Sequence, residues 1–405
     1  MGRAALNGMD ARALRILVLS FYYHPDLCAG SFRTTPFVAA LRARAPPGTQ
    51  VDVLSTLPNR YHSFTQDAAQ LETSPGLAIH RVKLPPHRSD IAGQSRAFVH
   101  FARKALANVA GKRYDLVFAT SSRLMTAALG AWIARRTQAR LYLDIRDIFV
   151  DTLQDVLPAG VGWPVSRALS LVESWTMRRA DCINLVSPGF ERYFRARYAD
   201  RRLSWFTNGI DPEFLQPAPA RPRARGERVT IVYAGNIGDG QALERILPGL
   251  ARALRDRARF VVIGDGGRRT ELQAALAAAR ADNVEIRPPV GRSELLDAYY
   301  TADVLFLHLG NLPAFENVLP SKLFEYASLG KPVLAGVGGY AARFIAAEIS
   351  NAAVFTPCDV QGAVEAFGRL VIAERARPEF TARYARANIA AAMADDVLAL
   401  ASRGT

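Results

Sequence analysis

Short apolar runs alternate with amphipathic stretches along the whole chain. The runs are rich in Val, Ile and Leu and are bounded by polar or turn residues, which is typical of buried strands. In the first half they predict strands at residues 14–21, 50–56, 77–84, 114–121, 139–147 and 181–188, with helices at 34–44 and 126–136. Strands that alternate with helices predict a parallel sheet with helical crossovers.

The same pattern restarts after a break in the chain. Residues 216–228, "QPAPARPRARGER", are rich in Pro and Arg without apolar periodicity, as expected of an interdomain linker. Further strands are predicted at 228–235, 258–266, 283–290, 302–309 and 331–337. A chain of 405 residues suits two domains. We therefore expect an α/β protein with two Rossmann-like domains, whose parallel sheets face an interdomain cleft. Their expected limits are 1–215 and 229–380, and a C-terminal helix at 381–405 is expected to return to the first domain.

The stretch "LPSKLFEYASLGKP", residues 319–332, places two charges at the start of a short predicted helix. Pro320 and Ser321 mark the helix start, and Lys322 adds positive charge to a helix N-terminus, which suits an anion such as a phosphate. Glu325, one turn further on the same face, suits a pair of sugar hydroxyls. A phosphate beside a diol describes a nucleotide. The alternative is an exposed i,i+3 ion pair with no function.

Charged and small residues also gather where other predicted strands end. "DIRD" places Asp144, Arg146 and Asp147 at the carboxyl end of a strand, where ligands bind in such sheets. Gly30 lies at a loop-to-helix junction, where the backbone can approach a phosphate, although a plain turn glycine explains it equally well. His24 also follows a strand, but a lone His is more often structural.

Composition narrows the chemistry. Cys28, Cys182 and Cys358 are far apart and lack metal-ligand spacing, so we expect neither a disulfide framework nor a zinc site. No DxD-like metal cluster is evident. No apolar run approaches the roughly 18 to 20 residues that span a bilayer, and residues 14–23 are too short for a signal peptide. These features predict a cytoplasmic protein.

The positive charge is concentrated in the first half. Of 51 Lys and Arg and 37 Asp and Glu, residues 1–210 carry 28 and 15, so residues 211–405 carry 23 and 22. A basic half can meet nucleic acid, an anionic membrane surface or an anionic substrate, unless it only reflects an Arg-rich composition. Nucleic acid is the weakest of these, because the basic residues are not interleaved with aromatics in a recognised module.

One segment of the basic half has the pattern of a membrane-interface helix. Between Arg96 and Arg113, the apolar residues at helical spacing are Phe98, Phe101, Ala102, Ala105, Leu106 and Val109. The opposite face holds Arg96, His100, Arg103 and Lys104. We expect this helix to lie in an anionic membrane surface. The alternative is a helix that packs on the sheet of its own domain.

With these motifs in place, the chain resembles glycosyltransferase family 4, which comprises nucleotide-sugar transferases of the GT-B fold. It is most similar to a bacterial surface-polysaccharide subset that includes N-acetyl-L-fucosamine transferases. Nearly the whole chain takes part, through "YYHPDLCAGSFR", "DIRDIFVD", "TNGIDPEF", "YAGNIGDGQALERIL" and "LPSKLFEYASLGKPVLAG".

The resemblance implies a role for each candidate residue. Glu325 would hold the donor ribose, and Lys322, Arg146 and Asp144 would act in catalysis. The other donor-binding residues would be Ser321, Leu323, Gly235, Asn236, Gly238, Gln241, Asn317, Glu316 and Gly30. Residues at the acceptor or in the cleft would be Arg33, His24, Asp147 and Ser121.

The chain departs from the family at three places. The first of two family glutamates falls on Asn317, with Glu316 one residue away. Asn236 and Gln241 stand where an Arg and a Lys usually meet the diphosphate, so Lys322 must supply the charge, with Arg33 or Arg146 as helpers. A His that many members carry is replaced here by Thr120 and Ser121.

The resemblance implies a retaining glycosyltransferase of hexosyl or N-acetylhexosaminyl type that needs no metal. The donor would be a nucleoside-diphosphate sugar, UDP foremost, with an N-acetylated deoxy-amino sugar in the subset named above. The acceptor would be a lipid-linked glycan or lipopolysaccharide at the inner face of the bacterial inner membrane, as in O-antigen synthesis. Two alternatives remain: a sugar-nucleotide epimerase of the same fold, and a non-catalytic nucleotide-sugar-binding subunit.

Overall fold

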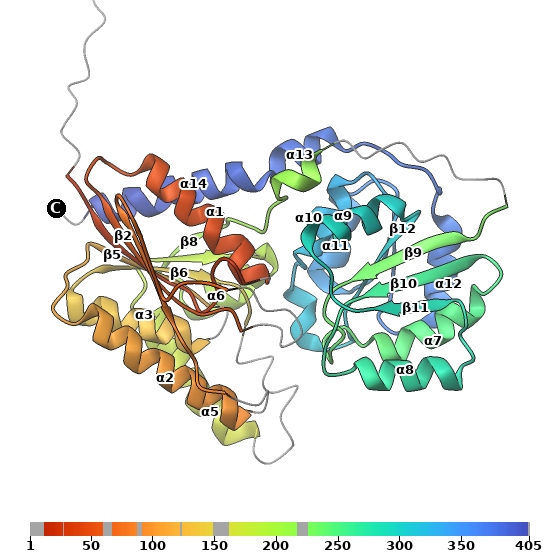
Figure 1. Ribbon diagram of the computed structural model, residues 1–405, viewed down its shortest axis with the longest axis horizontal. Helices are drawn as coiled ribbons and strands as arrows, with labels where there is room; N and C mark the ends of the chain where they lie inside the picture. The colour runs from red at the N-terminus through yellow and green to blue at the C-terminus, as the bar shows by residue number, and fades with distance from the viewer. Residues whose placement is uncertain are drawn as a thin grey trace, which may run out of the picture. The chain divides into compact units, whose positions relative to one another are not determined.

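The computed structural model describes residues 12–403 apart from residues 27, 60–66, 87–90, 122–123, 149–161 and 217–225 (Figure 1). Most of the predicted linker therefore lies outside the described residues. The chain forms two compact units. The first comprises Met1–Val186, Glu191–Thr207 and Ile389–Thr405, and the second comprises Ser187–Phe190 and Asn208–Asn388.

The first unit is built on an eight-stranded sheet in the order β3-β4-β2-β1-β5-β6-β7-β8. Its parallel strands are β1 (Arg15–Leu19), β2 (Gln50–Thr56), β4 (Leu77–Val82), β5 (Leu116–Thr120), β6 (Arg140–Ile145), β7 (Cys182–Leu185) and β8 (Arg202–Ser204). The edge strand β3 (Leu71–Ser74) runs antiparallel to β4. Its four residues are all exposed, so it lacks the apolar signal of the predicted strands, and the three-residue β8 was not predicted either.

Helices cover both faces of this sheet (Figure 1). On one face, α1 (Ala29–Arg44) and most of α14 (Arg386–Ser402) share an apolar core with the strands, including Phe37, Leu41 and Val397. The other face carries α2 (Ile91–Val109), α3 (Leu124–Thr137) and α5 (Gly162–Met177). The short α6 (Glu191–Arg197) completes the unit.

The structure corrects the predicted membrane helix. In α2, Ala97, Phe98, Phe101, Ala105 and Val109 are all buried in the unit. Phe101 makes an edge-on contact with Phe21, at a ring-centroid distance of 5.2 Å. The apolar face of α2 therefore packs on its own domain and cannot enter a bilayer. Among the described residues, no helix is both long and apolar enough to cross a membrane.

The second unit holds a six-stranded parallel sheet in the order β11-β10-β9-β12-β13-β14. The strands are β9 (Val229–Ala234), β10 (Ala258–Ile263), β11 (Val284–Arg287), β12 (Val304–His308), β13 (Val333–Gly336) and β14 (Ala352–Phe355). The last of these was not predicted, because a run of four residues carries little periodicity.

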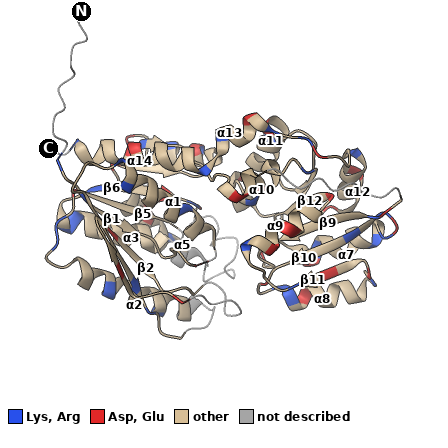
Figure 2. Ribbon diagram, turned by 45° about the horizontal axis from the view of Figure 1, so that its top comes forward, with Lys and Arg blue, Asp and Glu red and all other residues tan. Residues whose placement is uncertain are grey.

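The helices of the second unit are α7 (Leu243–Ala253), α8 (Arg269–Ala278), α9 (Arg292–Thr301), α10 (Lys322–Ser328), α11 (Gly339–Glu348), α12 (Val360–Arg369) and α13 (Pro378–Tyr384). Short 3-10 turns are η1 (Pro188–Phe190), η2 (Pro212–Leu215) and η3 (Pro313–Asn317). Helices α8 and α9 carry charges of both signs (Figure 2). The two predicted Rossmann-like domains with parallel sheets are thus confirmed.

Candidate active site

The start of α10 lies against the loop that follows β9. The Lys322 amine is 4.8 Å from the centre of the Tyr233 ring. It also lies directly over Gly235, where an added Cβ would come within 1.5 Å of the Lys322 nitrogen. Gly235 has a φ of +147°, which favours glycine. The predicted site residues Gly235 and Lys322 are therefore brought together, and only a glycine permits this approach.

Hydrogen bonds hold the loop after β9 in shape. The Tyr233 hydroxyl donates to the Asn236 carbonyl at 2.6 Å, and the Asn236 side-chain amide donates to Gln241 Oε1 at 2.8 Å. A Cβ at Gly238 would meet Asn236 Nδ2 at 2.4 Å. Because Gln241 accepts through its oxygen, its NH2 group can still donate to an anion. The side-chain amides of Asn236 and Gln241 therefore lie at the positions where the family usually has an Arg and a Lys.

His308 holds the backbone of this loop in place at Gln241. Its Nε2 accepts from the Cys358 N–H at 3.0 Å, so the ring proton is on Nδ1, which donates to the Gln241 carbonyl at 2.7 Å. Burial lowers the pKa of His308 to about 4, so the ring stays neutral. His308 lies in the strand predicted at 302–309, but the sequence gave no sign that it supports Gln241.

The side chains of Lys322 and Glu325 are both partly buried and make no hydrogen bond within the described part of the chain. Burial lowers the pKa of Lys322 to about 8, although the charge of Glu325 opposes the shift. Burial likewise raises the pKa of Glu325 to about 7, against the charge of Arg292. Side chains without a hydrogen-bonded partner whose pKa values are shifted toward neutrality are typical of ligand-binding sites, which makes Lys322 and Glu325 candidates for one.

An ion network stands behind Glu325. Arg292, the first residue of α9, donates to Glu213 at 2.6 Å and also pairs with Asp211. Asp211 pairs in addition with Arg386, and both residues are buried. Sequence reasoning missed this network, because Asp211 and Arg386 are 175 residues apart.

The first turn of α10 differs from the prediction in one respect. Ser321 makes no side-chain cap. The N–H of Leu323 donates to the Pro320 carbonyl at 3.1 Å, and that of Phe324 donates to the Ser321 carbonyl at 3.2 Å. The Leu323 side chain belongs to the core, with 0% exposure. Two N–H groups of the first turn therefore already have acceptors within the turn. The Lys322 amine is then the main group at the helix start that can attract an anion.

The two candidates for the first family glutamate lie in η3. Glu316 is exposed and lines a pocket of about 410 Å³ together with Phe315 and Gly338. Asn317 is half-buried, and its carbonyl accepts from the Ser187 hydroxyl at 2.6 Å. The choice between Glu316 and Asn317 stays a prediction.

In the first unit, the predicted site residues Asp144 and Arg33 pair with each other in the interior. Asp144 is 1% exposed and Arg33 is 5% exposed. Arg33 donates to both oxygens of Asp144 at 2.8 Å and to two backbone carbonyls, while Asn184 donates to Asp144 at 2.8 Å. Burial alone would raise the pKa of Asp144, but Arg33 and Asn184 outweigh it and lower the pKa. Both side chains are therefore engaged with each other, and their predicted roles in catalysis and at the acceptor stay predictions.

Arg146 remains the candidate cation of the first unit. Its Nε is buried without a hydrogen-bond partner among the described residues. A Cβ added to Gly30 would meet Arg146 Nη1 at 3.1 Å, so the guanidinium lies at the start of α1. Burial lowers the pKa of Arg146. Gly30 and Arg146 together form a place suited to an anion.

The other predicted residues of the first unit divide between interior and surface. Ser121 is 2% exposed, and its hydroxyl accepts from the Arg146 N–H at 3.1 Å, so it positions Arg146. His24 and Asp147 are exposed. Within the described residues, no cluster of three or more His, Cys, Asp or Glu side chains could hold a metal ion.

Two family models match the chain. Residues 31–209 match a glycosyl transferase 4-like domain, and residues 228–372 match glycosyl transferases group 1. Together these matches cover most of the chain, which therefore belongs to the glycosyltransferases of GT-B type.

Characterised relatives are similar over part of their length. The chain is 26% identical over 294 residues to a D-inositol 3-phosphate glycosyltransferase of Streptomyces avermitilis, covering 66% of this chain and 61% of the relative. It is 24% identical over 209 residues to the putative colanic acid biosynthesis glycosyl transferase WcaI of Escherichia coli, covering 49% and 51%. The chain thus spans less than two thirds of the length of these relatives.

Solved structures share the fold over nearly the whole chain. The sucrose-phosphate synthase of Thermosynechococcus elongatus has a TM-score of 0.67 at 15% identity, covering 97% of both chains. Anabaena Alr3699/HepE in complex with UDP-glucose has a TM-score of 0.62 at 14% identity, covering 95% of this chain and 99% of the other. Identities this low show the fold and leave substrates open.

Proposed function

We propose that this GT-B enzyme is a retaining glycosyltransferase that moves a sugar from a nucleoside-diphosphate donor, UDP foremost, to a lipid-linked glycan or lipopolysaccharide acceptor. The observation that carries the donor assignment is the pair Lys322 and Glu325. The two side chains lie one turn apart, partly buried and without a bonded partner in the described ranges. A diphosphate at Lys322 and a ribose at Glu325 satisfy both.

The proposed chemistry follows from where charge develops. As the bond between the sugar C1 and the diphosphate oxygen breaks, negative charge grows on the leaving diphosphate. Lys322 and the amide of Gln241 stabilise that charge. The acceptor oxygen bonds to C1, and the acceptor hydroxyl proton ends on the leaving diphosphate. The residues that hold the diphosphate would replace a divalent ion, so we propose that no metal is needed.

The acceptor and the pathway are inferred from the relatives and from the distribution of charge. WcaI is described as an enzyme of colanic acid biosynthesis, and Alr3699/HepE binds UDP-glucose. The family resemblance favours an N-acetylated deoxy-amino sugar as the transferred group. A basic first half and a neutral second half fit an anionic, membrane-linked acceptor and a soluble donor. We accordingly propose an enzyme at the cytoplasmic face of the bacterial inner membrane.

A ligand panel tests the donor assignment. Thermal shifts measured with UDP, GDP, dTDP and ADP, and then with sugars of the best nucleotide, should show stabilisation by UDP compounds. Glu325→Ala should reduce the shift, because it removes the hydrogen bonds proposed to hold the ribose. Stabilisation by none of these nucleotides would refute the proposal. Release of free sugar from the donor without acceptor, in the presence of EDTA, would support a metal-independent transferase over a non-catalytic subunit. Formation of an epimerised sugar nucleotide would favour the epimerase instead.

A further inference from the structure

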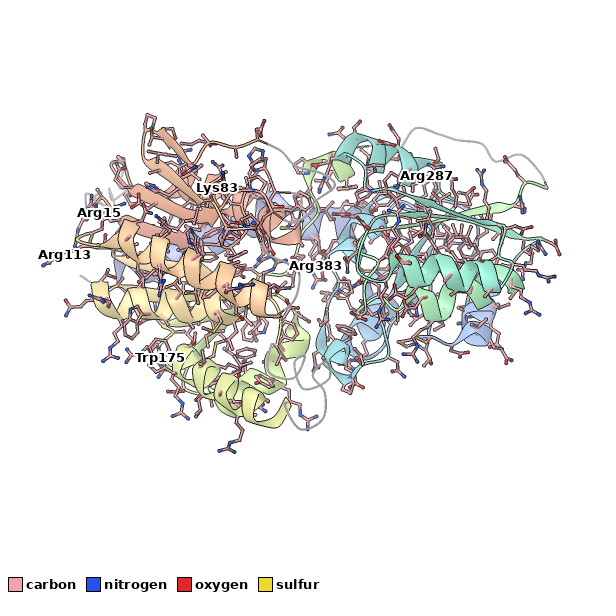
Figure 3. The ribbon with its side chains drawn as sticks, turned by 60° about the horizontal axis from the view of Figure 1, so that its bottom comes forward. Arg15, Lys83, Arg113, Trp175, Arg287 and Arg383 are labelled. Carbon is pink, nitrogen blue, oxygen red and sulfur yellow. The ribbon has the colours of Figure 1, made fainter. Side chains whose placement is uncertain are left out.

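One face of the first unit is strongly basic. Helices α2, α3 and α5 lie side by side over the sheet (Figure 3). Their exposed basic residues, with two that directly follow α5, are Arg96, Arg103, Lys104, Arg135, Arg136, Arg167, Arg178 and Arg179. The sequence of the three helices contains one carboxylate, that of Glu173. Glu173 is 3% exposed and accepts hydrogen bonds from Tyr193 and Tyr198. The outer surface of these helices, called the basic face below, therefore has no acidic group.

Large apolar side chains stand among these charges. Leu171 is 71% exposed, Val99 49% and Trp132 43%. The rings of Trp132 and Trp175 are 6.5 Å apart, and the Arg179 guanidinium lies 5.4 Å from the centre of the Trp175 ring. Tryptophan beside arginine is typical of surfaces that bind at a bilayer interface. There the apolar part of the ring faces the acyl chains and the charged group stays at the level of the headgroups.

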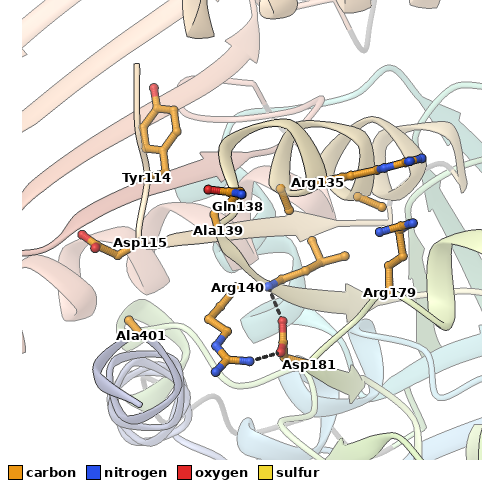
Figure 4. Close-up of a pocket in the computed structure, with 12 residues that line it drawn as sticks. Tyr114, Asp115, Arg135, Gln138, Ala139, Arg140, Arg179, Asp181 and Ala401 are labelled. Atoms are coloured by element: carbon orange, nitrogen blue, oxygen red, sulfur yellow. Dashed lines mark hydrogen bonds and ion pairs between the residues drawn. The ribbon is translucent and has the colours of Figure 1, made fainter. Parts of the chain in front are cut away.

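Arg179 also lines a pocket of about 450 Å³, whose lining residues are shown in Figure 4. Arg140 in its wall is paired with Asp181 at 2.7 Å. Arg135 and Arg179 line the same pocket and have no carboxylate partner in the part of the chain that the structure describes. A guanidinium free of carboxylates is suited to hold a phosphate oxygen.

We propose that the basic face docks the enzyme on an anionic lipid bilayer. The proposal rests on the proposed function, since a lipid-linked acceptor would lie in that bilayer. The sequence analysis predicted membrane contact through the apolar side of α2, which is buried. The surface proposed here is instead the outer side of α2, α3 and α5. The exposed apolar residues favour lipid over nucleic acid, because a nucleic acid offers no apolar interior for Leu171 and Val99.

Vesicle flotation of the full chain tests the docking surface. The protein should float with vesicles of phosphatidylcholine and phosphatidylglycerol, remain unbound with phosphatidylcholine alone, and detach as salt rises. The variant Arg135→Glu/Arg136→Glu should bind at least about thirtyfold more weakly, given about 1 kcal/mol for each lost charge near an anionic leaflet. Trp132→Ser should release the fraction that stays bound at high salt.

A matched control separates this surface from net charge. Arg252 and Arg369 are exposed, lie in the last turns of α7 and α12, and belong to the second unit. Arg252→Glu/Arg369→Glu changes the charge equally and should float like the wild type. Equal loss in both variants, no binding at low salt, or displacement from vesicles only by nucleic acid competitor would overturn the proposal.

The test is independent of catalysis. UDP stabilisation should be unchanged in Arg135→Glu/Arg136→Glu, because these residues are not part of the donor site. A protein that binds UDP but never floats would refute the docking surface and leave the proposed function standing. A protein that floats but binds no nucleotide would refute the proposed function alone.

Discussion

Each unit has a pair of oppositely charged residues near the carboxyl ends of its parallel strands. The two pairs differ in whether their side chains bond to each other. Arg33 and Asp144 are interior, and each oxygen of the carboxylate is hydrogen-bonded. Lys322 and Glu325 are partly buried and unbonded within the described residues. Arg33 and Asp144 meet each other's hydrogen-bonding needs and so contribute to the fold. Keeping Lys322 and Glu325 charged while partly buried costs free energy, and a ligand with a phosphate and a diol can offset this cost.

The largest effect should come from breaking the interior pair. Asp144→Asn leaves the Arg33 charge buried without a counter-charge, which typically costs about 3 to 5 kcal/mol of unfolding free energy. Urea denaturation measures this. The control is Asp395→Asn, because Asp395 pairs with Arg44 on the surface at 2.6 Å and such pairs contribute about 0 to 1 kcal/mol. Similar stability losses in both variants would mean that burial does not distinguish the pairs.

Removing the unpaired cation should act on the rate instead of the fold. Lys322→Ala takes away a charge that is most valuable when the diphosphate leaves, so kcat should fall by about a hundredfold, equivalent to about 3 kcal/mol. The melting temperature should not decrease. Steady-state kinetics with the best donor of the panel gives both constants, and an unchanged kcat with a raised KM would assign Lys322 to ground-state binding only.

The sequence could predict that Lys322 and Glu325 lie together, but not that Arg33 and Asp144 form a buried ion pair. Lys322 and Glu325 lie in one short helix, so their spacing alone brings them together. Arg33 and Asp144 are 111 residues apart, and the sequence places both near strand ends without showing that they meet. Arg292 and Asp211 are 81 residues apart and were missed for the same reason. The positions of most strands follow from the local apolar pattern, whereas side-chain pairing between distant segments does not.

Glu325 should control recognition of the ribose. In Glu325→Ala the donor KM should rise by about tenfold to a hundredfold, because hydrogen bonds to a charged group contribute about 1.5 to 3 kcal/mol. The wild type should bind 2′-deoxy-UDP more weakly than UDP, and the variant should bind both alike. A variant that still discriminates between the two nucleotides would show that another group reads the ribose.

The pH profile should reflect both charges of the site. With the pKa of Glu325 near 7 and that of Lys322 near 8, kcat/KM for the donor should be greatest between these values. Below about pH 7 the carboxylate gains a proton and loses acceptor capacity, and above about pH 8 the amine loses its charge. Glu325→Gln should remove the acidic limb and keep the basic one. Persistence of both limbs would assign the acidic limb to a different group.

The smallest expected effect is a gain in stability from Glu325→Gln, opposite in sign to the loss from Asp144→Asn. Since the folded pKa of Glu325 lies at about 7, above its ordinary value of 4.5, the folded protein binds this proton more tightly than the unfolded chain. Stability from this group is thus complete below about pH 4.5 and decreases as pH rises toward 7. At pH 8 the neutral Gln avoids the loss, but it also removes the nearby negative charge that favours the charged form of Lys322, so we expect a net gain of about 1 kcal/mol. Urea denaturation without nucleotide should show this gain at pH 8 and almost none at pH 4.5. A variant that is less stable than the wild type at pH 8 would place Glu325 with Asp144, as a carboxylate that the fold itself needs.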